Sequence, residues 1–152
     1  MEKDLLLNYI SKEFPNYEVK LGKQYVEILI DASQITTVAN FLCNDEKMKF
    51  DYLFCETGVD YLTYFEMVYH LESTLYRHQV VVKAKIEDRN QPIIETVYSF
   101  WKSAEYHERE IFDLMGITFT NHPDLRKIFL DADWVGFPLR KDYIDEVNIV
   151  ER

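Results

Sequence analysis

The sequence predicts an α+β fold, in which helices cover one face of a β-sheet and form a two-layer sandwich with it. Patterns typical of helices and strands follow one another in the order helix, strand, strand, helix, strand, strand, strand. Short polar turns separate the later strand-like runs, so neighbouring strands are expected to pair antiparallel. A last helix and a long irregular segment follow this sheet domain.

The first elements have clear local signals. A helix is predicted over residues 4–14, where apolar residues recur at helical spacing and Pro15 ends the pattern. Residues 17–21 and 25–30 alternate apolar and polar side chains around a short turn, which predicts a β-hairpin with one buried face.

The middle of the chain continues the same layer structure. A second helix is predicted over residues 35–44, with Asp31 or Ser33 as the residue that caps its first free amides. It is expected to pack on the sheet. Three strand-like runs rich in Tyr, Phe and Val come next, over residues 50–55, 62–71 and 79–86.

The last third of the chain changes character. A third helix is predicted over residues 103–115, and Gly116 stands where helices often end on a residue of positive φ. Residues 117–143 form a long loop broken by turn residues, and a short acidic tail follows Asp145. We therefore expect one domain over residues 1–152, with a scaffold up to residue 100 and the helix, loop and tail after it.

The composition excludes several classes of protein. Lys and Arg number 17 against 27 Asp and Glu, a formal charge of −10, which disfavours binding to nucleic acid or to anionic lipid. Four scattered glycines cannot form a dinucleotide or phosphate loop, and two cysteines are too few for a four-thiolate cluster. Apolar runs are too short for a membrane helix. The cysteines are expected to be reduced and buried.

The third helix carries the densest charge. Its apolar positions and Glu108 share one face, so this carboxylate is expected to be buried and to need a partner. Arg126 and Arg140 in the following loop are the predicted partners, because a guanidinium satisfies both carboxylate oxygens. Arg109 has acidic residues four positions away on either side, which predicts ion pairs with Glu105 and Asp113 on the outer face.

A catalytic or metal-binding interpretation of this region is the less favoured alternative. It would use one set of acidic and histidine side chains, Glu108, Glu110, Asp113, His107 and His122. The spacing lacks the second histidine of a zinc-binding HExxH helix, and no serine or cysteine lies in a nucleophile turn.

Aromatic residues instead suggest an interface. Trp134, Phe137 and Tyr143 lie beside Arg140 and Lys141 in the irregular segment, which is a composition typical of protein interfaces. We expect the loop over residues 117–143 to dock on a partner and to become ordered on assembly.

The same residues carry a family resemblance. The motifs are Glu108-Arg109-Glu110, Asp113, Gly116-Ile117, Phe119, His122-Pro123-Asp124-Leu125-Arg126, Trp134, Gly136 and Pro138-Leu139-Arg140-Lys141-Asp142-Tyr143. Together they resemble the signature of the 30 kDa subunit of respiratory complex I, which is also called its C subunit. Upstream runs also look like this family: Asp51-Tyr52-Leu53, Gly58-Val59-Asp60 and Val68-Tyr69-His70-Leu71.

The resemblance implies a subunit without a redox centre, in the peripheral arm of a proton-pumping NADH:quinone oxidoreductase. It implies enzymatic activity for the complex, with flavin, iron-sulfur clusters and quinone on other subunits and no catalytic residue on this chain. The implied partners are the large D-type subunit at the quinone site and iron-sulfur subunits. The implied location is the cytoplasmic side of the bacterial inner membrane, reached only through the complex.

Two alternatives stay open beside this resemblance. Similar subunits occur in ferredoxin- or plastoquinone-linked complexes and in membrane-bound hydrogenases. A stand-alone enzyme using carboxylates and histidines is the third possibility. Many family members carry a C-terminal extension that this sequence lacks, so contacts of such an extension are not implied here.

Overall fold

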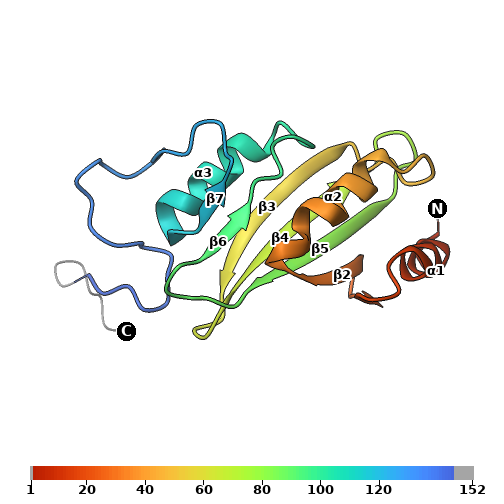
Figure 1. Ribbon diagram of the computed structural model, residues 1–152, viewed down its shortest axis with the longest axis horizontal. Coiled ribbons are helices and arrows are strands. Elements are labelled where there is room, and N and C mark those ends of the chain that lie inside the picture. Colours follow the sequence, from red (N-terminus) through yellow and green to blue (C-terminus); the bar gives the residue numbers. More distant parts are fainter. Residues whose placement is uncertain (1, 146–152) are drawn as a thin grey trace.

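A five-stranded sheet forms the base of the protein in the computed structural model, which describes residues 2–145 (Figure 1). The strands are β1 (Glu18–Leu21), β2 (Val26–Asp31), β3 (Tyr52–Asp60), β4 (Phe65–Glu72) and β5 (Gln79–Ile86). Their order across the sheet is β1-β2-β5-β4-β3. The pairs β1–β2, β3–β4 and β4–β5 are antiparallel, as the sequence predicts. The central pair β2–β5 is parallel and was not predicted.

Three helices lie on the sheet: α1 (Lys3–Glu13), α2 (Ile35–Asn44) and α3 (Ala104–Met115). Figure 1 shows α2 across the sheet and α1 beside β2, at the end of the molecule away from α3. A 3₁₀ turn over Ala32–Gln34 leads into α2, and the amide of Asp31 donates to Gln34 Oε1 in a capping box. These boundaries agree with the predicted helices to within one or two residues.

The sheet has one apolar and one polar face, which confirms the predicted two-layer sandwich. Ile28, Val82 and Tyr69 lie side by side in register and are buried under the helices. The opposite face carries polar, partly buried side chains such as Glu27 and Lys83.

Strand β3 is longer than predicted, because it continues past Cys55 to Asp60. Gly58 explains how α3 packs there: a Cβ at this position would lie 2.8 Å from Met115 Sδ. The missing side chain therefore lets α3 approach the sheet. Strand β4 begins at Phe65 rather than at residue 62.

A second, two-stranded parallel sheet was not predicted. It consists of β6 (Ile93–Glu95) and β7 (Thr118–Thr120), which flank α3 in the chain. Each strand has only three residues, too few for a recognisable alternation. Because β6 belongs to the predicted scaffold and β7 to the predicted loop, this pairing joins the two parts into one body.

The composition predicts reduced, buried cysteines and no membrane-spanning helix. Cys43 and Cys55 are free thiols and are half-buried rather than fully buried. Within residues 2–145, no helix has the length and apolar character needed to cross a membrane.

Candidate functional site

The signature residues gather around α3 and the segment that follows β7. We call residues 121–145 the strap. Figure 1 shows the strap looping past α3, at the end of the molecule away from α1. The residues of α3 divide between those that face the sheet and those that face the strap.

Glu108 faces the sheet and is fully buried, as the helical spacing predicts. Its Oε1 accepts the amide hydrogen of Val97 at 2.8 Å, and its Oε2 accepts the hydroxyl hydrogen of Thr96 at 2.5 Å. The carboxyl thus joins α3 to the backbone that follows β6. Burial raises the pKa of Glu108 to about 7, although these two hydrogen bonds favour its ionised form.

The predicted partners of Glu108 are wrong. Arg126 is exposed and pairs with Asp124, with Nε 2.9 Å from Oδ2. Arg140 donates from Nε to the carbonyl of Met115 at 2.6 Å and from Nη2 to the carbonyl of Gly116 at 3.3 Å. The helix C-terminus leaves carbonyls without intrahelical partners, and this guanidinium satisfies them.

Arg109 and Asp113 point to the strap and are buried beneath it. Arg109 donates from Nε and Nη2 to the carbonyls of residues 126–127, each at 3.2 Å. Asp113 Oδ2 accepts the amide hydrogens of residues 128–130 at 2.7 to 3.0 Å. The prediction that Arg109 pairs with Glu105 and Asp113 on the outer face is therefore wrong, because the strap covers that face.

His122 fixes the beginning of the strap. Its side chain is fully buried, and its Nε2 lies 3.0 Å from the carbonyl of Glu105. Its Nδ1 accepts the amide hydrogen of Asp124 at 3.0 Å. These partners require a neutral imidazole with the proton on Nε2. Both ring nitrogens are therefore occupied by backbone groups, which leaves neither one for a metal ion.

Asp60 holds the other end of the strap. It accepts two hydrogen bonds from Arg89, at 2.5 and 2.9 Å, and the amide hydrogen of Lys141 at 2.8 Å. Arg89 also lies 3.2 Å from Asp142 Oδ2. The guanidinium of Arg89 holds the pKa of Asp60 well below its usual range. The sequence-based site did not include Asp60 or Arg89, although Asp60 ends one of the upstream family motifs.

Along its length the strap exposes several large apolar side chains. They are Ile128, Phe129, Trp134, Val135, Leu139 and Ile144, with exposed fractions from 36% to 86%. Such a concentration in one segment is typical of a protein contact surface. The remaining signature residues differ in solvent exposure. Four are exposed, namely Glu110, Pro123, Lys141 and Asp142, and two are half-buried, namely Pro138 and Tyr143.

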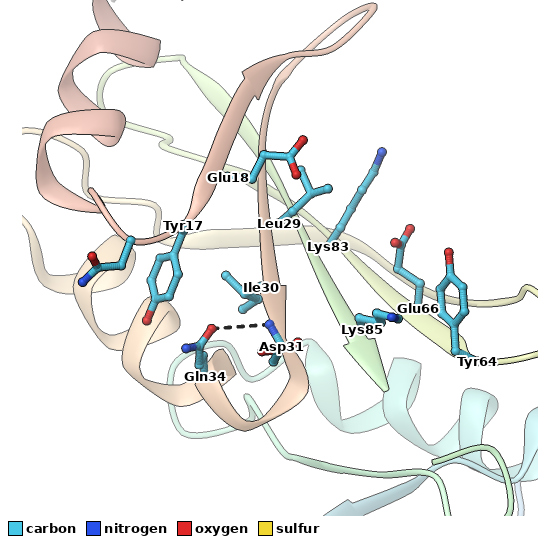
Figure 2. Close-up of a pocket in the computed structure, with 11 residues that line it drawn as sticks. Tyr17, Glu18, Leu29, Ile30, Asp31, Gln34, Tyr64, Glu66, Lys83 and Lys85 are labelled. Atoms are coloured by element: carbon cyan, nitrogen blue, oxygen red, sulfur yellow. Dashed lines mark hydrogen bonds between the residues drawn. The ribbon is translucent and has the colours of Figure 1, made fainter. Parts of the chain in front are cut away.

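An open hollow of about 400 Å³ lies away from the strap (Figure 2). Its lining includes Lys83 and Lys85, which could attract an anion. Lys83 is already paired with Glu27 at 2.9 Å, however, and Lys85 with Glu87 at 2.8 Å. The hollow contains none of the signature residues, so the strap and α3 are the stronger candidate site.

The fold and these anchors define an α+β protein that holds an extended segment on a rigid base. Residues 28–147 match the family model described as the 30 Kd subunit of respiratory-chain NADH dehydrogenase. The chain belongs to this family, as the resemblance of its motifs indicated.

Named relatives agree with this assignment. The C subunit of the NADH-quinone oxidoreductase of Roseiflexus castenholzii is 42% identical over 120 residues, covering 77% of this chain and 68% of the relative. The corresponding C subunit of Moorella thermoacetica is 37% identical over 142 residues, covering 92% and 94%. A combined C/D subunit of Phocaeicola vulgatus is 46% identical over 99 residues, covering 64% of this chain and 19% of that much longer protein.

A solved structure shares the fold. A chain of the membrane-bound sulfane sulfur reductase, an archaeal respiratory membrane complex, superposes with a TM-score of 0.71 at 22% identity. The match covers 97% of this chain and 88% of the other. At this identity the match supports the α+β fold alone.

Proposed function

We propose that this chain is the 30 kDa, or C, subunit of an NADH:quinone oxidoreductase, and that it has a structural and assembly role there. The 37% and 42% identities to proteins named as C subunits support this role. The proposed complex oxidises NADH and reduces quinone through cofactors on other subunits, and it pumps protons. This chain is proposed to carry no flavin, metal or cluster.

The state of the signature side chains supports the cofactor-free role. Asp113 and Arg109 are bonded to strap backbone, and His122 has a backbone partner on each ring nitrogen. Within residues 2–145, no group of three or more His, Cys, Asp or Glu side chains is placed to hold a metal ion. These residues therefore serve as anchors in the proposal, and the stand-alone enzyme is disfavoured.

The proposed main partner is the large D-type subunit. Relatives named as C/D subunits combine the two subunit names on one chain, which favours close contact between the two parts. Iron-sulfur subunits of the peripheral arm are proposed as further neighbours. Attachment to the cytoplasmic face of the membrane is proposed to occur only through the complex.

The exposed apolar run of the strap is the observation that carries the docking proposal. Val135 is 86% exposed and Phe129 is 64% exposed, although each lies within a few residues of a buried anchor. A segment held in place with apolar side chains toward solvent needs little further ordering to bind a partner. The strap is therefore proposed as the surface that contacts the D-type subunit.

A charge placed on the strap tests this proposal. The full-length variant Val135→Asp should fold like the wild type, because the side chain at this position is exposed. When it is purified from solubilised membranes, the amount of D-type subunit that copurifies should be several-fold lower than with the wild type. NADH:quinone reductase activity in the membranes should fall in proportion. Leu75→Asp is the matched control, because Leu75 is 62% exposed on the turn before β5.

The outcomes separate the alternatives. Normal assembly of Val135→Asp, or failure of Leu75→Asp alone, would move the interface away from the strap. If the wild-type chain copurifies with a ferredoxin-linked, plastoquinone-linked or hydrogenase complex, it is a subunit of that related complex. Recovery as a lone active monomer would support the enzyme alternative.

A further inference from the structure

Three oxygen-bearing side chains meet beneath α3, away from the strap. Glu56 of β3 and Tyr69 of β4 are opposite each other in the sheet, so they are neighbours on the face that the helices cover. α3 packs along β3, because Ser103 Oγ donates to the carbonyl of Leu53 and a Cβ at Gly58 would lie against Met115 and Ile111. Glu108, one turn before Ile111, is therefore close enough for its charge to act on Glu56 and Tyr69, although no hydrogen bond joins them. Their exposed fractions are 5%, 0% and 0%, so all three lie out of contact with bulk water.

Two of these side chains lack hydrogen-bond partners. Both carboxyl oxygens of Glu56 and the hydroxyl of Tyr69 are buried without a partner among the described residues. Buried polar groups are rarely left in this state, because they lose their hydrogen bonds to water without replacing them. An ionised Glu56 would moreover be a buried charge. Burial without a partner therefore favours the neutral form of the Glu56 carboxyl.

The surrounding charges do not supply a cation. Glu95 of β6 repels the carboxylate of Glu108, and the charge of Glu108 in turn disfavours ionisation of Glu56. His122 Nε2 is 3.7 Å from Glu108, but Nδ1 of the same ring accepts the amide hydrogen of Asp124, which a doubly protonated ring could not do. Arg109, the next residue on α3, points to the strap. Two carboxylates in one apolar site without a counter-charge cannot both stay ionised.

We propose that Glu56 and Glu108 form a buried proton-binding site between β3 and α3, which holds at least one proton at neutral pH. Glu56 carries that proton, because Glu108 already accepts two hydrogen bonds that favour its ionised form. Protonation also removes the charge of a buried carboxyl that has no hydrogen-bond partner of its own. Loss of the proton would loosen α3, the helix that anchors the strap.

The electrostatics agree with the geometry. Burial, with the charge of Glu108 adding to it, raises the pKa of Glu56 well above its usual value. Burial likewise raises the pKa of Tyr69, and both glutamates contribute to that rise. Because the folded pair keeps protons that the unfolded chain releases near pH 4.5, unfolding at neutral pH releases protons. Stability should therefore fall as the pH rises from about 4.5 to beyond 7.

The test compares proton release on unfolding of the full chain. Calorimetry at pH 7 in two buffers of different ionisation enthalpy counts the released protons. The substitution Glu56→Gln keeps the shape of the side chain but cannot ionise, so the variant should release about one proton fewer than the wild type. Above neutral pH it should also unfold at a higher denaturant concentration than the wild type. Glu110→Gln, at an exposed position of α3, should change neither quantity.

Several results would overturn the proposal. Equal proton release from Glu56→Gln and wild type would mean that Glu56 is ionised in the fold. If that variant does not fold, infrared spectra of the wild type at neutral pH give the answer through the carbonyl band of a protonated carboxylic acid. Absence of this band would show that neither glutamate holds a proton.

Discussion

The buried charged residues of α3 bond mostly to backbone groups outside the helix, not to one another. Glu108 binds Thr96 and the amide of Val97, while Asp113 binds three successive amides of the strap. A carboxylate accepts several hydrogen bonds at once, so one buried charge can order a stretch of irregular chain. This explains why a helix with so many charges has few ion pairs.

Replacing Glu108 by Ala should destabilise the fold by roughly 2–5 kcal/mol, because the Thr96 hydroxyl and the Val97 amide would lose their buried acceptor. Urea unfolding at neutral pH measures this loss. Glu110→Ala is the control: it removes the same carboxylate from an exposed position of α3 and should change stability by less than about 0.5 kcal/mol. Equal stability of the two variants would show that Glu108 does not hold α3 to the β6 backbone.

Gly116→Ala should cost about 1–3 kcal/mol, because this residue has a φ of +69° that disfavours a side chain. The added Cβ would also lie 2.6 Å from the ring of Phe137 and 2.8 Å from Arg140 Nη2. Denaturant unfolding gives the magnitude. Gly22→Ala should cost less, since its φ is not positive and the added Cβ would meet only the flexible end of Glu27. A smaller loss at Gly116 than at Gly22 would contradict this account.

Among the elements, the strap is anchored by ionised side chains. Asp60 holds its last part and Asp113 its middle, while β7 and His122 fix its beginning. The guanidinium of Arg89 lowers the pKa of Asp60. Burial acts to raise the pKa of Asp113, but hydrogen bonds from the amides of residues 128–130 outweigh it and the pKa is lowered. The strap is therefore anchored by carboxylates that must be charged.

Acid should release the strap before the sheet unfolds. Both carboxyls have pKa values below the usual 3.8, so their stabilisation is complete above that pH and is lost as the pH falls below it. Amide NMR signals of Phe129 and Lys141 should shift in this range while those of Val82 in β5 stay constant. Asp113→Asn should show a weakened Phe129 contact already at neutral pH. Simultaneous loss of all three signals would mean that the strap and the sheet unfold as one unit.

At the scale of the whole molecule, the structure changes which part of the strap is expected to become ordered on assembly. The sequence suggested that the entire loop needs a partner, yet its anchored positions have partners within the chain. Residues 131–136, between the anchors, are exposed throughout. We therefore separate an internally anchored part of the strap from an exposed part that a partner would cover.

Hydrogen exchange should distinguish these two parts. In the free chain, amides of residues 128–130 should exchange slowly, because Asp113 accepts their hydrogens. Amides of residues 131–136 should exchange fast, except that of Trp134, which donates to the carbonyl of Asp131. On assembly only the second group should gain strong protection. Fast exchange of both groups in the free chain would restore the view that the whole strap orders on assembly, and no gain in the complex would place the interface elsewhere.

The sequence by itself determined the local elements and the family. Helical spacing placed Glu108 on the buried face of α3, and the glycine after that helix marked its end, because both signals depend only on nearby residues. Alternation and short turns gave the antiparallel pairs. The signature motifs identified the family, while the docking role of the strap stays a proposal.

Only the tertiary structure decided which groups meet. Three features depend on contacts between residues that are separated by intervening chain. They are the parallel pairing of β2 with β5, the pairing of the three-residue strands β6 and β7, and the hydrogen bonds of Glu108. Helical spacing shows that a carboxylate is buried, but the path of the flanking backbone determines which donors reach it. For the same reason the sequence did not reveal the Glu56–Glu108 site, since these residues are 52 positions apart and meet only when α3 packs on β3.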